Sequence, residues 1–476
     1  MHPASKINRI AVPPLLRELA SIFNAHGKQV FLVGGAVRDT LRGEKCADWD
    51  LAGDALPEDV MRIFPGVIPT GIKHGTVTIR YKKHSIEVTT LRTDGDYSDG
   101  RRPDSIHYTS SIEEDLCRRD FSINAVAVTL PDGYVIDPFG GRVDIEKNLI
   151  RCVGRAADRL NEDGLRALRA FRFASQLGFD IDGELLSAIT ERPQMIIPVS
   201  MERVKAEFDK IVASKKPSSA LLYMERCGIL KLVLPELLNC RGVEQKGYHR
   251  FDVLTHSLLA CDYAARSGYK QTVRLAALFH DVGKPATAKL GDGGVWTFHS
   301  HETLSADITR AIMTRLRYPN AGIEETAHLV REHMFNYTNS WSASAVRRFV
   351  RRVGEENLTA LFDLRRADSF GMLGTEPPPE LSLDFRNRID SVLAAGRVLS
   401  RKDLAVSGRD LMEAGIPGGE KMGRILNSLL EAVLEDPEMN SKEKLLEMAN
   451  RLFCRCHFPL STLPLPAALR QNTEER

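Results

Sequence analysis

The spacing of apolar and polar residues changes once along the chain. Residues 12–26 carry apolar side chains at helical spacing, and residues 29–33 form a short apolar run that ends in Gly34 and Gly35. A run of this length before a glycine pair is typical of a strand followed by a tight turn. Residues 36–41 then begin another helix. Further short strands are predicted at 50–52, 75–81, 85–90 and 124–129.

From residue 144 onward, helical periodicity dominates to the end of the chain. Four prolines separate successive predicted helices: Pro193, Pro198, Pro217 and Pro235. We therefore expect a compact α/β domain up to about residue 140, followed by all-helical regions. With 476 residues the chain is too long for one hydrophobic core, so about two to four domains are expected.

Composition and charge are those of an ordinary soluble globular protein. Hydrophobic residues make up 43% and charged residues 27%, and the formal net charge is +2. Arginines gather at 101–102, 118–119 and 151–172, which suits a polyanionic partner as well as a solvated surface. No apolar stretch is long enough to span a bilayer, no signal-peptide pattern opens the chain, and the cysteines stand singly apart from Cys454 and Cys456. We expect a cytoplasmic protein with no membrane partner.

Two aspartates, Asp48 and Asp50, follow the glycine turn at a spacing of two. Alternate residues of a strand face the same side, so both carboxylates can hold one magnesium ion against a triphosphate. Backbone amides at Gly34 and Gly35, with Arg38 one turn later, can cradle the phosphates. An isolated D-x-D is usually solvated surface, but its place just after this turn favours a nucleotide site.

Glu87 is flanked by apolar strand residues in Ile86-Glu87-Val88. An acid in a central strand is costly unless it is paired or binds metal, which makes Glu87 a candidate third catalytic carboxylate. A residue of an edge strand that faces water is the equal alternative. Further on, Arg119 and Asp120 precede another apolar strand, where they form either a helix cap with a salt bridge or, as the upstream aspartates favour, a sugar-phosphate contact.

Residues 162–172 carry a row of charges at a spacing of three: Asp163, Arg166, Arg169 and Arg172. On one helix the first three cover one face within about 120°, and the fourth lies at its margin. A row of surface salt bridges is one interpretation. The other is base selection, because cytosine and adenine both present an amine donor beside a ring-nitrogen acceptor, whereas uracil and guanine reverse that pattern. An aspartate and an arginine could thus select C and A without a template.

A second group of residues follows the order His…His-Asp…Asp: His256, His280, Asp281 and Asp368. His280 and Asp281 are predicted to lie on an apolar helix, where they are expensive to bury unless they bind something. Imidazole together with carboxylate suits a divalent transition metal.

Six segments resemble, in order and approximate spacing, the class II tRNA nucleotidyltransferase and poly(A) polymerase family: LVGGAVRDTLRG, DWDLA, EVTTLR, EEDLCRRDFSINAVA, IDPFGGRVDIE and NEDGLRALRAFRFASQLGF. The resemblance covers about residues 30–178. It implies a polymerase-beta-like nucleotidyltransferase head followed by all-helical neck, body and tail. It also implies that Asp48 and Asp50 bind magnesium, that Arg119 and Asp120 read the ribose, and that 163–172 read the base. Residues 92–102 resemble the flexible loop of the family.

Residues 247–370 resemble the HD phosphohydrolase superfamily, with His256, His280, Asp281 and Asp368 in the place of its metal ligands. His301 and His333 are further candidate ligands. The resemblance implies either phosphatase or cyclic phosphodiesterase activity or a vestigial site.

Together these observations predict a tRNA nucleotidyltransferase that builds or repairs the 3′-terminal CCA from CTP and ATP with magnesium. An A-adding enzyme or poly(A) polymerase of the same family stays open. A metal phosphohydrolase with a regulatory nucleotide-binding head is a third hypothesis, disfavoured by intact Asp48 and Asp50. The expected domains are the catalytic head, the neck and body for base selection and RNA binding, the HD domain, and a tRNA-binding tail: 1–140, 141–245, 246–375 and 376–476.

Overall fold

The computed structural model of the chain describes residues 4–46, 48–95, 106–245, 249–291, 296–379, 382–395 and 400–455. These residues form two compact units. The first comprises Met1–Arg331 and Asp363–Thr375, and the second comprises Glu332–Phe362 and Glu376–Arg476. No described helix is both long enough and apolar enough to cross a membrane.

The first unit opens with a seven-stranded sheet in the order β3-β4-β5-β2-β1-β8-β9. Its strands are β1 (Val30–Val33), β2 (Asp50–Gly53), β3 (Val67–Gly71), β4 (Thr76–Tyr81), β5 (His84–Thr90), β8 (Ala127–Thr129) and β9 (Val135–Ile136). All neighbours are antiparallel except β2 and β5, which run parallel. Two short strands, β6 (Arg92–Asp94) and β7 (Ile106–Tyr108), pair separately. The predicted strands are thus confirmed to within a few residues at their ends.

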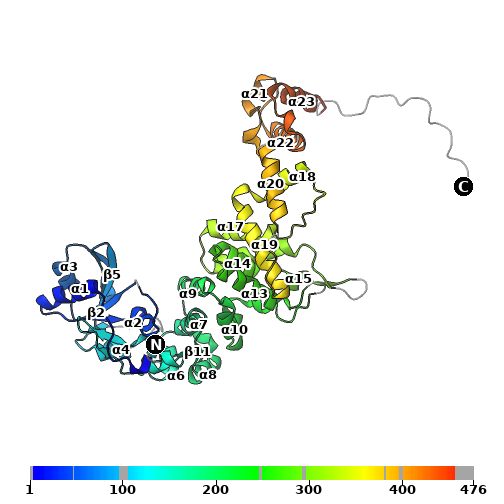
Figure 1. Cartoon of the computed structure of the whole chain (residues 1–476). Helices are drawn as coiled ribbons and strands as arrows, with labels where there is room; N and C mark the ends of the chain where they lie inside the picture. The colour runs from blue at the N-terminus through cyan, green and yellow to red at the C-terminus, as the bar shows by residue number, and fades with distance from the viewer. Residues whose placement is uncertain are drawn as a thin grey trace, which may run out of the picture. The chain divides into compact units, whose positions relative to one another are not determined.

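Five helices accompany the sheet: α1 (Pro14–Ala25), α2 (Gly35–Leu41), α3 (Pro57–Ile63), α4 (Ile112–Cys117) and α5 (Gly141–Glu146). In Figure 1, α1 and α3 lie beside the strands in the blue part of the chain. Helix α1 shows why this sequence is helical and buried: Leu16, Leu19 and Phe23 recur on one face and are fully covered by the core. This part confirms the expected α/β head.

Helices dominate after residue 144, as predicted. The following elements are α6 (Ala156–Glu162), α7 (Leu165–Leu177), α8 (Gly183–Glu191), α9 (Met201–Ala213), α10 (Pro217–Arg226), α11 (Ile229–Val233) and α12 (Pro235–Leu238). Pro217 and Pro235 each occupy the first position of a helix, where the missing N–H costs nothing. Two-residue strands β10 (Leu149–Ile150) and β11 (Asp180–Ile181) pair in parallel beside them.

The first unit continues with α13 (Val253–Arg266), α14 (Gln271–Phe279), α15 (Lys284–Thr287), α16 (His301–Arg315) and α17 (Asn320–Glu332), of which the last residue belongs to the second unit. A short hairpin joins α15 to α16, formed by β12 (Lys289–Leu290) and β13 (Trp296–Thr297). One hydrophobic core runs without interruption from Ala4 in the head to Ile323 in α17. The sheet, α7, α9, α10 and α13 therefore share buried surface.

The second unit is all-helical, with α18 (Ala343–Val353), α20 (Leu383–Ala395), α21 (Gly408–Glu413), α22 (Glu420–Glu435) and α23 (Lys442–Arg455). Helix α19 (Leu358–Leu373) contributes its first turn to this unit and the rest to the first. Arg348 and Arg351 of α18 pair with Glu431 of α22. Most arginines of α18 thus serve contacts within this unit.

Candidate active site and candidate metal centre

Two acidic residues of the head, Asp50 and Glu87, lie opposite each other on two parallel strands. Asp50 is the first residue of β2, and its partner in the register with β5 is Glu87. Both side chains are exposed, and β5 has a neighbour on each side, so Glu87 does not stand on an edge strand. Although Asp50 still reaches solvent, surrounding protein atoms remove part of its hydration, and this desolvation, together with repulsion from Glu87 and Asp48, raises its pKa to about 6. The negative charges of Glu87 and Asp48 thus act on Asp50, an arrangement typical of functional sites.

Asp48 lies just before β2, because the strand begins at Asp50. The prediction that both aspartates alternate on one strand is therefore wrong in this detail. The charge of Asp48 still contributes to the raised pKa of Asp50, and the shared cation stays a prediction.

The glycine turn lies directly beside the acids. Gly34 has φ 71°, a conformation that favours glycine, and it caps α2. A Cβ at Gly34 would meet Asp50 Oδ2 at 3.6 Å and Arg119 Nη1 at 3.5 Å. Arg38 is buried on α2 and donates to Asn124 Oδ1 over 2.8 Å. The turn, the acids and the arginines thus face one space.

The predicted ribose-reading pair is built into a charge network. Arg119 pairs with the fully buried Asp115 over 3.2 Å. Asp120 is buried and accepts from Arg169 Nε over 2.7 Å. Burial alone would raise the pKa of Asp120, but the Arg169 guanidinium holds it below its usual range. Asp120 is therefore a charged tie between the head and α7.

The predicted base-reading row departs from one helical face at its first member. Helix α6 ends at Glu162 and α7 begins at Leu165, so Asp163 lies in the elbow between them. The extended backbone of Asp163, with φ −154° and ψ 107°, separates the two helices, and only glycine fits at position 164, where a Cβ would lie 2.0 Å from the carbonyl oxygen of Met195. Asp163 Oδ1 accepts from the Leu165 amide over 3.0 Å. The charge row therefore starts outside the helix.

The arginines of α7 each have an acidic partner. Arg166 is buried and pairs with Glu162, and Arg172 pairs with Glu207 of α9 over 2.7 Å. These are partly the salt bridges of the alternative interpretation, but they do not run along a solvated surface.

All these elements enclose one cavity of about 750 Å³. Its lining includes Gly34, Gly35, Arg38, Asp50, Glu87, Arg119, Asp120, Asn124, Asp163, Arg166, Arg169, Arg172, Phe173 and Arg203. The structure thus brings every predicted head and neck residue to this cavity except Asp48, which is not among its lining. Eight arginines and four acidic residues line the cavity, an excess of positive charge that suits a polyanion arriving with a divalent cation.

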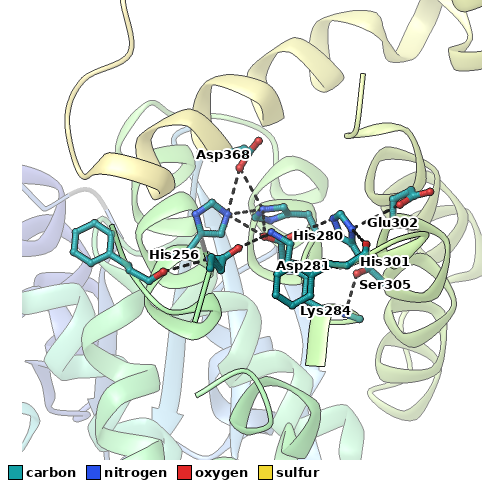
Figure 2. A network of polar contacts seen from close by, with 12 residues as sticks. His256, His280, Asp281, Lys284, His301, Glu302, Ser305 and Asp368 are labelled. Carbon is teal, nitrogen blue, oxygen red and sulfur yellow. Dashed lines mark hydrogen bonds and ion pairs between the residues drawn. The ribbon is translucent and has the colours of Figure 1, made fainter. Parts of the chain in front are cut away.

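The second group of residues converges in the first unit, as Figure 2 shows. His256 Nε2 of α13 lies 2.8 Å from His280 Nε2 at the end of α14. The same atom of His256 lies 3.2 Å from Asp281 Oδ2 and 3.3 Å from Asp368 Oδ1 of α19. One ligand atom from each of His256, His280 and Asp368 falls within 4.8 Å of the others. All four predicted ligands are thus brought together.

Close packing of α19 on α13 makes this convergence possible. A Cβ at Gly371 would lie 2.7 Å from the His256 carbonyl oxygen and 2.9 Å from its Nδ1. His256, His280, Asp281 and Asp368 are all buried. Burial alone would lower the pKa of His280, but Asp281 and Asp368 raise it to about 10. The two carboxylates therefore attract positive charge strongly at this point.

Further polar groups surround these four. Lys284 Nζ lies 2.7 Å from Asp281 Oδ2, and His301 Nε2 lies 3.2 Å from Asp281 Oδ1. The ring of His249 lies 5.1 Å from that of His256. His333 is buried in the second unit.

Comparison with known proteins gives three matches to family profiles along the chain. Residues 30–151 match the Poly A polymerase head domain, residues 178–240 the probable RNA and SrmB-binding site of polymerase A, and residues 248–373 the HD domain. The CCA-adding enzyme of Geobacillus stearothermophilus is 32% identical over 443 residues, which cover 91% of this chain and 96% of the relative. The chain belongs to the CCA-adding enzyme family. It is a nucleotidyltransferase.

Solved structures of CCA-adding enzymes agree with this membership. The Bacillus stearothermophilus CCA-adding enzyme in complex with CTP is 29% identical, with a TM-score of 0.72, and the match covers 94% of this chain and all of that one. The Thermotoga maritima CCA-adding enzyme complexed with tRNA shares the fold, with a TM-score of 0.52 and 21% identity over 93% of this chain and 97% of that one. Identity is higher toward part of the chain: the Geobacillus thermodenitrificans enzyme is 47% identical over 237 residues, 49% of this chain and 57% of that relative.

Nucleotidyltransferase and HD families both use divalent metals, and His256, His280 and Asp368 are a buried group that could hold such an ion. Exposed carboxylates suit magnesium in the head, and the buried imidazole and carboxylate set suits a transition metal.

Sequence reasoning missed several residues of this family member: Asn124, Phe173, Arg203, Glu207 and His249. Asn124 and Phe173 stand inside segments that carried the resemblance, but no pattern assigned them a role. The guanidinium carbons of Arg38, Arg169 and Arg172 lie 5.4, 5.8 and 3.9 Å from the centre of the Phe173 ring, which orders these arginines around one aromatic side chain. Arg203 and Glu207 act across about 40 residues of sequence and left no local signal.

Proposed function

We propose that this CCA-adding enzyme builds and repairs the 3′-terminal CCA of tRNA from CTP and ATP, without a nucleic-acid template. The observation that carries the proposal is the single cavity where Asp50 and Glu87 of the sheet face Asp163 and Arg166 of the elbow and α7. Such a cavity holds a triphosphate and its base at once. Relatives that match this chain over 96% and 98% of their own length are CCA-adding enzymes. Structures of CCA-adding enzymes were solved with CTP, with ATP and with tRNA.

In this proposal each side chain has one task. Asp48 and Asp50 would hold magnesium, with Glu87 as a third carboxylate, and the ion would neutralise charge on the triphosphate and favour loss of the proton from the attacking hydroxyl. Gly34, Gly35 and Arg38 bind phosphates. Arg119 and Asp120 contact the ribose. Asp163 accepts from the exocyclic amine of C or A, and the arginines 166, 169 and 172 supply donors toward the ring nitrogen.

The test is a matrix of three tRNA ends with single nucleotides. With tRNA that ends before CC, CTP alone should add CMP. With tRNA that ends in CC, ATP alone should add AMP, and with complete CCA nothing should be added. Addition of AMP only would indicate an A-adding enzyme, and repeated AMP addition to complete ends would indicate a poly(A) polymerase.

We further propose that the HD residues form a divalent-metal site that hydrolyses phosphomonoesters or 2′,3′-cyclic phosphates. The supporting observation is the buried convergence of His256, His280, Asp281 and Asp368, with Lys284 beside Asp281 to attract a phosphate. We also propose that the functional parts of the chain are divided at residues 140, 245 and 375. Because its substrates are tRNA and nucleoside triphosphates, we propose that the enzyme works in the cytoplasm. The intact Asp48 and Asp50 of the head disfavour a pure phosphohydrolase with a regulatory head.

A further inference from the structure

Asp163, the residue proposed to recognise the exocyclic amine, is not held by a helix. Its backbone is extended, with φ −154° and ψ 107°, between the end of α6 and the start of α7. Neighbouring turns therefore do not restrict its side chain as they would within α7. Selection of the correct base needs a fixed carboxylate plane, because a shift of the acceptor changes which base edge it fits. The Leu165 amide at the start of α7 holds only Oδ1, over 3.0 Å, so a second contact must set the plane of this carboxylate.

That contact comes from Arg203 on α9. Its Nη2 lies 2.7 Å from Asp163 Oδ2, and its Nη1 lies 3.2 Å from Oδ1. Two parallel bonds from one guanidinium fix the plane of a carboxylate as a single lysine could not. Both side chains are mostly covered, with 27% of Arg203 and 14% of Asp163 exposed. Arg203 also lines the nucleotide cavity.

Helix α9 is itself firmly seated, so it can serve as a reference. Its residues Val204, Phe208 and Ile211 are fully buried in the shared core. One turn after Arg203, the buried Glu207 pairs with Arg172 and lies 3.9 Å from Arg169. One face of α9 thus backs the row of charged side chains in the cavity.

We propose that Arg203 is a positioning residue for base selection. It holds the Asp163 carboxylate from α9, while the remaining lone pairs of that carboxylate stay available to the amine of C or A. The inference rests on the proposed function and deepens it. Loss of Arg203 should loosen Asp163 and reduce discrimination against U and G, while the triphosphate contacts at Gly35 and Arg38 persist.

The experiment measures kcat/KM for CTP and for UTP on tRNA that ends before CC. Arg203→Met removes the fork at similar volume, and Arg203→Lys keeps the charge without the fork. The CTP-to-UTP ratio should fall about tenfold or more in Arg203→Met and less in Arg203→Lys. In an Asp163→Ala background, Arg203→Met should lower the ratio no further. The matched control is Arg315→Met, which removes another two-bond pair, to Glu236 at 2.7 Å each, outside the cavity lining. It should leave the ratio unchanged.

Three results would overturn the proposal. One is a wild-type ratio in folded Arg203→Met. Another is an equal fall of both rates without a change in their ratio. The third is independent, multiplying effects of Arg203→Met and Asp163→Ala. If Arg203→Met does not fold, Arg203→Lys decides, because a folded variant with the wild-type ratio excludes the role. Failure of the wild type to add CMP at all would instead refute the proposed function, and this inference with it.

Discussion

The two acidic sites of this enzyme differ in how exposed their carboxylates are and in what compensates their negative charge. In the head, Asp50 and Glu87 are exposed in a cavity of about 750 Å³ and repel each other. In the HD site, Asp281 and Asp368 are buried against two histidines. Burial is tolerated in the second site because each carboxylate has a positive or hydrogen-bonding partner from the protein.

The difference shows where each site obtains its compensating charge. In the head, the repulsion among the carboxylates outweighs the attraction of Arg119 on Asp50, so a cation that arrives with a triphosphate is expected to bind there. The HD site supplies imidazole and carboxylate ligands from α13, α14 and α19, so it can hold a metal without substrate. We therefore expect the two sites to fail independently and in different ways.

The largest effect is expected at the head acids. Asp50→Ala or Asp48→Ala should reduce CMP and AMP addition alike by at least about a hundredfold, because a ligand of the catalytic metal is lost. Hydrolysis at the HD site should continue. Primer-extension rates on tRNA with each nucleotide measure the first effect, and phosphate release measures the second. Residual addition within about tenfold of wild type would refute the metal assignment.

A comparable loss, confined to the other site, is expected for His280→Ala or Asp368→Ala. Metal-stimulated hydrolysis and bound metal should both disappear, while nucleotide addition stays near wild type. Elemental analysis and phosphate release with nickel, cobalt, manganese or magnesium provide the measurements. A wild type with neither metal nor hydrolysis would show an inactive site. Loss of nucleotide addition in a folded variant would show that the two sites are coupled.

A smaller effect is expected from the base-reading residues. Asp163→Ala or Arg166→Ala should cost about 1–3 kcal/mol of discrimination, roughly 5- to 150-fold, so that UMP or GMP begins to be incorporated. CTP binding through the phosphates should persist. Misincorporation is measured on tRNA that ends before CC. A uniform fall in rate with unchanged selectivity would mean that these residues only support the elbow.

The smallest effect concerns stability and pH. The folded pKa of Asp50 is about 6, above its ordinary 3.8, so the folded state binds this proton more tightly than the unfolded state. The contribution of Asp50 to the stability of the magnesium-free protein should therefore fall as pH rises from about 4 to 6, and the melting temperature of Asp50→Asn relative to wild type should rise over this range. Melting temperatures in a chelator across this range test the sign. The exposed Asp158 gives a matched control, Asp158→Asn, which should leave the pH profile unchanged. An Asp50→Asn melting temperature no higher than wild type above pH 6 would contradict the repulsion inferred here.

Local patterns predicted the head well because its signals are local. The strand before Gly34, the acidic strand at Asp50 and the apolar flanks of Glu87 each lie within a few residues. The parallel pairing that sets Asp50 opposite Glu87 is a tertiary fact that no local pattern carries. In the HD region the order of four ligands could be predicted, whereas the approach at Gly371 that lets α19 reach His256 could not.

At the elbow around Asp163, the sequence contained a turn signal that the helix prediction for residues 162–172 did not take into account. Asp163-Gly164 is a turn-forming pair, which should have ended the predicted helix before Leu165. The regular charge spacing hid it. Arg203 and Glu207 could not be predicted, because their partners, Asp163 in the elbow and Arg172 on α7, are distant in sequence. Of the predicted flexible loop, residues 92–94 form β6, and 96–102 lie outside the described residues.

The uninterrupted core from Ala4 to Ile323 limits which helices the chain could lose during evolution. Polar ties reinforce it between α9 or α10 and the HD helices: Ser218 with Asp262, and Asp209 with Gln271 and Tyr318. A deletion that removed the HD helices would strip the cover from α9, the helix that carries Arg203. Evolved variants of this enzyme that lost the hydrolytic activity would thus still need these helices, because they cover the buried face of α9. Persistence of the HD helices in a lineage is therefore no evidence that the metal site still works.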